Sequence, residues 1–495
     1  MAVNTWDGAS DTNWNDAANW NTTGVTDRVP TSADDVVIAN VSNDPTMPDG
    51  LNPTIKSLEI ETGGQLTAGN NNISIEGVNS NGLAFYVSGT GAFVKGTSTI
   101  TFTDSSNQYI SINTSNANRT FYNVTVNKTG SGDVYIYQSR DGSSTEPLVI
   151  SNNLTISARG FNTANDSSSP SAYFDLTVSG QVTGAGTLTG NTSAILMGYF
   201  GMTGTYNATS GTTTINSRNG SGYRMSCGVG DIVHNNGTFK FDTTGGGNSN
   251  FILTGTSDGT NGIYDLEIDT GNTVTIENNA LSIHRNLTIT SGTLNTNGSS
   301  NYGLTVTGDV SLANNTTLTC NASTCSFGSI DIGSSGATLN GSSGTTTITG
   351  EKSDYAWTNA RGDNGYVHNN GKVVIETAGD TQIKENKFYD FELNLNSATT
   401  ELSWRDISGN AMAIYGDLTI TRGRLQSVTS GDSIDVYGNT YIAVTHGTLW
   451  HDADQDTNKI THHGLVTNHG TFKINDGTTV KLNGGIRQLG TLTIA

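Results

Sequence analysis

The chain has 495 residues, a formal net charge of −20, 61 glycines and only 13% charged residues. Nucleic-acid binding by charge needs a basic surface that displaces phosphate counterions, so DNA and RNA are excluded as partners. We find no apolar run of about 18 residues and no leader-like start, and therefore expect neither a membrane span nor Sec export. Short β-branched segments separated by Gly, Asn, Ser and Thr indicate an all-β protein rather than a disordered one.

The first segment, residues 1–52, differs in composition from the rest of the chain. The phrases TWDG and DTNWNDAANW place Trp6, Trp14 and Trp20 close together, and these are half of the six tryptophans. Stacked β-coils need a cover at their ends, because open strand edges recruit other chains. We therefore predict that the three tryptophans form an N-terminal cap or docking segment.

Three families of phrases recur in the same order along the rest of the chain. GTSTIT begins at Gly96, and related phrases begin at Gly211 and Gly344. FYNVTVN, IYDLEID and FYDFELN form a second family, and NNLTIS, RNLTIT and GDLTIT form a third. A fixed period indicates a repeat architecture, so we infer three degenerate supermodules of roughly 130 residues. The expected segments are 53–190, 191–325 and 326–450, followed by a partial repeat at 451–495.

Within each supermodule, apolar and polar residues alternate over strands of four to six residues. This period of two predicts half-buried strands, with Tyr264 and Tyr389 facing inward and Asp265 facing outward. Gly and Asn turn signals supply the positive φ angles that tight corners require. A sandwich of this length or a propeller of equal blades fits the pattern less well than a solenoid. We predict an elongated all-β solenoid, or β-helix, in which each coil packs on the next.

A possible calcium loop lies in the partial repeat, within the phrase HDADQDTNK. Asp452, Asp454, Asp456 and Asn458 alternate as the oxygen ligands of D-x-D-x-D loops do. However, Thr457 occupies the position of the turn glycine, and no bidentate Glu follows. A solvated acidic turn is therefore the competing interpretation, and structural Ca²⁺ is the one cofactor that the sequence suggests.

Histidines gather in the same region, where five of the eight lie between His446 and His469. Such a group could hold a transition metal on a threefold axis. The spacing matches no compact zinc pattern, so ordinary polar corner residues are the favoured interpretation. His234 and His368 precede identical NNG sequences, and we expect them at equivalent corners of the solenoid.

Two tryptophans and three cysteines complete the set of candidate residues. Trp357 in YAWTN and Trp404 in LSWRD lie between repeat phrases, where exposed rings could bind sugars or a partner surface. Packing between coils is the favoured interpretation for both. The cysteines cannot all pair and form no CxxC motif, so we expect them to be buried small apolar residues. They are Cys227, Cys320 and Cys325.

The TWDG…DxNWxxAANW…VP…DDVVI opening and the HNNGTFKF, FYNVTVN and NLTITSGTL phrases resemble Gly/Asn/Thr-rich β-solenoid proteins of marine bacteriophages. They are similar also to bacterial surface β-helix repeat proteins. The resemblance covers most of the chain, from Trp6 to the last phrase family. It implies a virion structural protein, such as an appendage, fibre or decoration protein, and it brings no catalytic residues.

We therefore predict a non-enzymatic structural protein of a bacteriophage virion that supports particle architecture and attachment to the host. It would be assembled in the host cytoplasm and become extracellular after lysis. Other virion proteins and host-surface glycans are the expected partners, and both a monomer and a homotrimer fit the pattern. The closing phrase LGTLTIA lacks a cap, and we expect a second copy or a partner to cover it.

Two other functions stay open. A bacterial cell-surface adhesin or extracellular matrix repeat protein would have the same solenoid. A polysaccharide depolymerase tailspike would need paired carboxylates in a groove. The outward acids of the second supermodule are replaced by Asn123, Thr125 and Asn127 in the first, which indicates a merely polar face.

Overall fold

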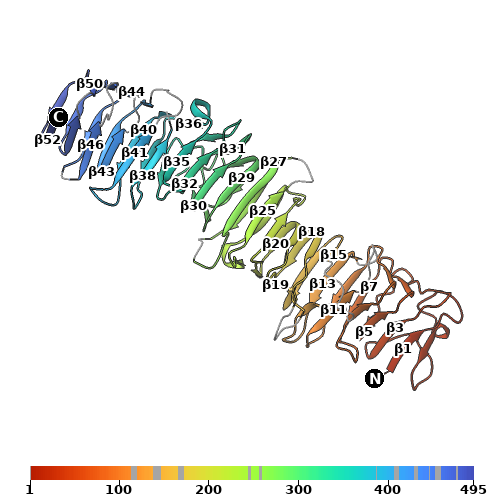
Figure 1. Cartoon of the computed structure of the whole chain (residues 1–495). Helices are drawn as coiled ribbons and strands as arrows, with labels where there is room; N and C mark the ends of the chain where they lie inside the picture. Colours follow the sequence, from red (N-terminus) through yellow and green to blue (C-terminus); the bar gives the residue numbers. More distant parts are fainter. Residues whose placement is uncertain are drawn as a thin grey trace. The chain divides into compact units, whose positions relative to one another are not determined.

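The computed structural model describes residues 2–112, 120–137, 147–165, 172–242, 247–255, 259–385, 387–405, 412–427, 433–444, 446–451, 459–474 and 478–494. Strands contain 55% of the residues and helical turns 2%, and the coils of the β-solenoid number about 17. Within each unit the parallel strands of successive coils stack on one another (Figure 1). The predicted all-β solenoid is therefore confirmed.

The chain divides into two compact units. Unit 1 contains Met1–Gly245 with Thr260–Gly262, and unit 2 contains Gly246–Gly259 with Ile263–Ala495. The boundary between the units falls inside the predicted segment 191–325, and the predicted supermodules stay predictions.

Unit 1 is built from strands that pair with the corresponding strand of the next coil. Its first sheet contains, in spatial order, β2 (Trp20–Thr22), β1 (Ala2–Trp6), β3 (Asp34–Ile38), β5 (Ser57–Ile60), β8 (Phe85–Val87), β11 (Gln108–Ile112), β14 (Val134–Tyr137), β17 (Gly160–Asn162), β19 (Thr187–Thr189), β21 (Thr205–Asn207) and β24 (Ile232–Val233). A second set of paired strands contains β4 (Thr54–Ile55), β7 (Asn72–Ile75), β10 (Thr99–Phe102), β12 (Thr120–Phe121), β13 (Asn123–Asn127), β15 (Leu148–Ile150), β16 (Leu154–Ala158), β18 (Leu176–Gly184), β20 (Ile195–Met202), β22 (Thr212–Ile215), β23 (Tyr223–Gly228) and β25 (Thr238–Asp242). The remaining elements of this unit are the pair β6 (Gln65–Thr67) and β9 (Ala92–Val94), and the 3-10 turns η1 (Ala17–Asn19) and η2 (Val229–Asp231).

Unit 2 follows the same plan. One five-stranded sheet contains β39 (Lys387–Phe388), β42 (Met412–Ile414), β44 (Ser433–Val436), β47 (Lys459–His462) and β50 (Thr479–Leu482). The other strands are β26 (Ser249–Thr254), β27 (Asp265–Glu277), β28 (Leu281–Ile283), β29 (Leu287–Asn295), β30 (Leu304–Leu312), β31 (Thr316–Thr319), β32 (Cys325–Ile332), β33 (Thr338–Asn340), β34 (Thr345–Ile348), β35 (Tyr355–Asn359), β36 (Tyr366–Val367), β37 (Lys372–Ile375), β38 (Thr381–Lys384), β40 (Asp390–Asn394), β41 (Glu401–Arg405), β43 (Leu418–Ser427), β45 (Thr440–Ile442), β46 (Gly447–His451), β48 (Val466–Asn468), β49 (Thr471–Ile474), β51 (Ile486–Gln488) and β52 (Thr491–Ile494), with the 3-10 turn η3 (Gly362–Asn364).

Like side chains stack on like inside each unit, because parallel pairing in register places equivalent residues of successive coils directly above one another. Figure 1 shows the strands of successive coils side by side along unit 2, from β27 toward β52. Burying each aliphatic or aromatic side chain contributes about 1.5–3 kcal/mol, so such rows hold neighbouring coils together. One fully buried row in unit 2 is formed by Ile283, Val306, Phe327, Ile348 and Ile375.

The NNG corners repeat from one unit to the other. In unit 1 the His234 ring accepts a hydrogen bond from the Asn236 N–H (3.0 Å), and in unit 2 His368 accepts one from Asn370 (3.1 Å). Both asparagines have positive φ, at 62° and 58°. The predicted equivalence of these two histidine corners is therefore confirmed.

No described helix is long and apolar enough to span a membrane.

Candidate functional site

The three N-terminal tryptophans form one buried cluster in unit 1. Trp20 packs edge-on against both other rings, with centroids 5.0 Å from Trp6 and 4.7 Å from Trp14. The Trp20 indole N–H donates to the Trp14 carbonyl at 2.8 Å. Strand β2 pairs with β1 in antiparallel orientation, whereas β1 and β3 are parallel. The cluster thus covers the first coil, as a cap would, while its docking role stays a prediction.

Trp357 and Trp404 are in the core of unit 2, each with 1% of its surface exposed. Both rings pack edge-on against Phe388, with centroid distances of 5.5 Å for Trp357 and 5.6 Å for Trp404. The Trp404 indole N–H donates to the Glu385 carbonyl at 2.8 Å. Both rings face inward and pack between coils, which confirms the packing interpretation, and the alternative, surface binding by these two rings, is wrong.

The predicted calcium ligands Asp452, Asp454, Asp456 and Asn458 lie outside the described residues. Among the residues that are described, no group of three or more His, Cys, Asp or Glu side chains is arranged to hold a metal ion.

Two adjacent histidines of the cluster point in opposite directions. His462 is fully buried, whereas the next residue, His463, is exposed. The cysteines are free and buried, as predicted, and burial raises the pKa of Cys227.

Alternation misplaces the tyrosine that is the second residue of each phrase in the second family. Tyr264 and Tyr389 precede their strands and are half-buried at corners, whereas the following Leu266 is buried as expected. Asp265 was expected to face solvent but is buried, because its carboxylate accepts a hydrogen bond from the Arg285 Nε at 2.8 Å. The outward acidic face of this strand is thus smaller than predicted.

A ladder of rings that are exposed or half-buried lies on the surface of unit 2. It consists of His368, Tyr389, Tyr415, Tyr437 and His463, and we call it the aromatic column. Tyr415 and Tyr437 stack with centroids 5.6 Å apart and planes 8° apart. Tyr437 and His463 stack at 4.7 Å and 5°. The exposed fractions of Tyr415 and Tyr437 are 41% and 48%.

The N-terminal end of the aromatic column, at His368 and Tyr389, is less regular. The His368 ring lies 5.6 Å from Tyr389 and 5.3 Å from Tyr415. Burial, with a smaller contribution from Lys387, lowers the pKa of His368. The lowered pKa favours the neutral form of this imidazole.

Backbone register creates the aromatic column. Tyr389, Tyr415, Tyr437 and His463 each directly follow a strand of the five-stranded sheet, and the last residues of these strands are buried. The Tyr437 N–H donates to the Ile414 carbonyl at 2.8 Å, which keeps successive corners in register.

Glycines close the same corners. A Cβ at Gly438 or Gly464 would collide with the carbonyl oxygen of the glycine one coil earlier. An aromatic ring followed by Gly at consecutive corners is therefore the sequence signal for Tyr415, Tyr437 and His463. Sequence reasoning missed the column because its rings lie in separate phrases and meet only where successive coils pair in register.

Polar groups flank the C-terminal end of the column, at His463. The His463 ring is 3.2 Å from an Asp435 carboxylate oxygen and 3.4 Å from the Asn483 amide nitrogen. Beside the column, Asp390 and Asp417 each accept a hydrogen bond from a backbone N–H of the next coil, at 2.8 and 2.7 Å. These carboxylates make the surroundings of the column acidic.

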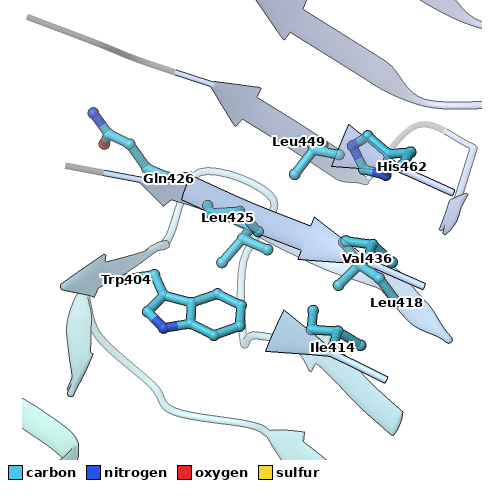
Figure 2. Close-up of a pocket in the computed structure, with 9 residues that line it drawn as sticks. Trp404, Ile414, Leu418, Leu425, Gln426, Val436, Leu449 and His462 are labelled. Atoms are coloured by element: carbon cyan, nitrogen blue, oxygen red, sulfur yellow. The ribbon is translucent and has the colours of Figure 1, made fainter. Parts of the chain in front are cut away.

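The interior beside the column contains a small apolar cavity of about 10 Å³, the space of roughly one water molecule (Figure 2). Trp404, Leu425 and His462 line it, and the His462 Nδ1 is 2.8 Å from the Thr440 hydroxyl. Burial, then repulsion from His463, lowers the pKa of His462 to about 4. The cavity is too small for a ligand, so it is a packing feature.

Two shallow grooves lie elsewhere on the surface. One of about 200 Å³ in unit 2 has Lys352 paired with Asp331 (3.1 Å) and Lys384 over the Tyr355 ring (4.6 Å). In both cases the ammonium group already has a partner. The second groove, of about 520 Å³, lies in unit 1 and is lined by Ser32, Lys56, Glu76, Gly77, Val78, Asn79, Ser80, Asp104 and Ser106.

Comparison with known families assigns similarity only to the start of the chain. A family model described as a domain of unknown function, DUF8693, matches residues 5–129. This segment includes the tryptophan cluster and the larger groove of unit 1, but not the aromatic column. No curated protein and no solved structure matches the chain.

Proposed function

We propose that this chain is a non-enzymatic structural and attachment protein of a bacteriophage virion, present as a fibre or surface appendage. The observation that carries the proposal is the in-register stacking of coils, with buried rows such as Ile283, Val306 and Phe327. A stack in which every coil is hydrogen-bonded to its neighbours suits a stiff element that must persist outside a cell. The capped first coil and the exposed aromatic column fit a protein that is anchored through one surface and attaches through another.

A bacterial cell-surface adhesin is the second candidate, because an exposed column of rings would serve attachment equally well. The two proposals differ in where the protein is found. We would raise antibodies against the purified chain and label gradient-purified virus particles and uninfected cells of the host. The virion proposal expects gold label on the particles, at a fixed position. Label on uninfected cells and none on particles would overturn it in favour of the adhesin.

The proposal includes contacts with other virion proteins and an assembly of either one or three copies. Light scattering on the purified chain separates these two assemblies. A mass near 51.8 kDa indicates a monomer, and a mass about three times larger indicates a homotrimer.

A further inference from the structure

We propose that the aromatic column of unit 2 binds a neutral polysaccharide chain that runs along it from coil to coil. This inference deepens the proposed attachment function by naming the class of ligand. Its failure would leave the particle-labelling result unaffected, so the two proposals are tested separately.

The spacing of the column suits an extended polymer. Successive rings from Tyr415 to His463 are 5.6 and 4.7 Å apart, close to the spacing of paired strands, which is about 4.8 Å. An extended chain of pyranose sugars advances by a similar distance per ring. One sugar can therefore lie opposite each corner, so that weak contacts add along the polymer.

The exposed atoms of the column favour oxygen-rich ligands. The faces of Tyr437 are directed toward Tyr415 on one side and His463 on the other, so ring edges and hydroxyl groups remain for a ligand. Ring edges carry the positive end of the aromatic quadrupole and attract oxygen atoms. Within the described residues, the hydroxyls of Tyr415 and Tyr437 make no hydrogen bond, so each can donate to and accept from a sugar hydroxyl.

Charge selects a neutral polymer over an acidic one. Asp390, Asp417 and Asp435 lie beside the column, and Lys387 is the cation that acts on the His368 ring. The whole chain has a net charge of −20. A polyanion would therefore be repelled both near the column and at longer range.

Affinity electrophoresis of the full chain tests this proposal. Native gels would contain hydroxyethyl cellulose, laminarin, galactomannan or dextran as neutral polymers, and alginate as the acidic polymer. We expect retardation by at least one neutral polymer and none by alginate at the same concentration. Retardation by alginate alone, or by none of the five polymers, would overturn the proposal.

Variants locate the binding to the column. The double variant Tyr415→Ala/Tyr437→Ala should weaken retardation about tenfold or more, because it removes two adjacent contact residues. Tyr441→Ala is the matched control, since Tyr441 is 42% exposed in the same unit and packs on His469 outside the column. Equal weakening by the control would show that the column is not the site.

A conservative variant guards against misfolding of the double variant. Tyr437→Phe keeps the stacked ring but removes the hydroxyl, and it should weaken retardation severalfold with an unchanged melting temperature. Retardation equal to that of the unmodified chain in both Tyr437→Phe and a folded double variant would contradict the proposal. Circular dichroism identifies the variants that are folded.

Discussion

Single residues determine where the chain turns. Asn236 and Asn370 adopt the left-handed backbone region, which asparagine tolerates better than β-branched residues do. Their N–H groups are satisfied by the ring nitrogen of the histidine two positions earlier. The HNNG phrase is therefore a complete local turn, which is why it was readable from the sequence alone.

His462 makes the stability of unit 2 depend on pH. Burial and repulsion from His463 lower its pKa to about 4, whereas an unfolded histidine titrates near 6.5. Between these two pH values the unfolded chain binds the extra proton, so the free energy of unfolding falls as the pH is lowered from 6.5 to 4. The expected loss is about 3 kcal/mol, and it is complete near pH 4.

Urea denaturation at several pH values, followed by tryptophan fluorescence, measures this loss. Because acidic residues such as Asp34 also titrate on acidification, the relevant quantity is the difference between the unmodified chain and His462→Leu. The leucine variant should lose less stability between pH 6.5 and 4. His463→Asn, which removes an exposed neighbour, should retain most of the pH dependence. Parallel pH profiles for the unmodified and leucine chains would refute the assignment to His462.

At the scale of strands, alternation identified the buried rows but not the ends of the strands. Leu266 and Ile268 are buried as predicted, because a period of two is a direct consequence of strand geometry. Tyr264 and Tyr389 were misplaced because alternation does not reveal the residue at which a strand begins. For Trp357 and Trp404 the sequence left packing and surface binding open, because their position between repeat phrases is compatible with a loop, whereas each lies inside a strand and is buried.

The N-terminal cap gives a prediction for one element. Replacing Trp20 by Ala removes the ring that contacts both Trp6 and Trp14, and such a change costs about 3–5 kcal/mol in a packed core. Hydrogen exchange measured by mass spectrometry should then show faster exchange in β1, β2 and β3. Trp450→Ala is the control, because Trp450 is only half-buried, with Lys473 over its ring at 3.9 Å. Unchanged protection of β1–β3 would mean that the cluster does not hold the first coil.

At the scale of the molecule, composition and repeats were sufficient for the solenoid, because each coil depends on the same local pattern as its neighbours. They were not sufficient for the aromatic column. Its rings lie far apart in sequence, and they come together only because successive coils pair in register. A surface site of this kind therefore depends on the number of residues in each coil, because that number decides which side chains lie above one another. Recurring phrases in the sequence do not give this number for each coil.

Net charge gives the prediction for the whole chain. With 43 acidic and 23 basic residues, repulsion exceeds attraction, and exposed ion pairs such as Lys352–Asp331 contribute about 0–1 kcal/mol each. Raising NaCl from about 10 to about 300 mM shortens the range of this repulsion, so the melting temperature at pH 7.5 should rise by a few degrees. Differential scanning calorimetry measures the shift.

The same salt increase at pH 5, near the isoelectric point of about 4.6, should have a smaller effect because most of the net charge is gone. A melting temperature that falls with salt at pH 7.5 would mean that attractive pairs outweigh the excess of negative charge.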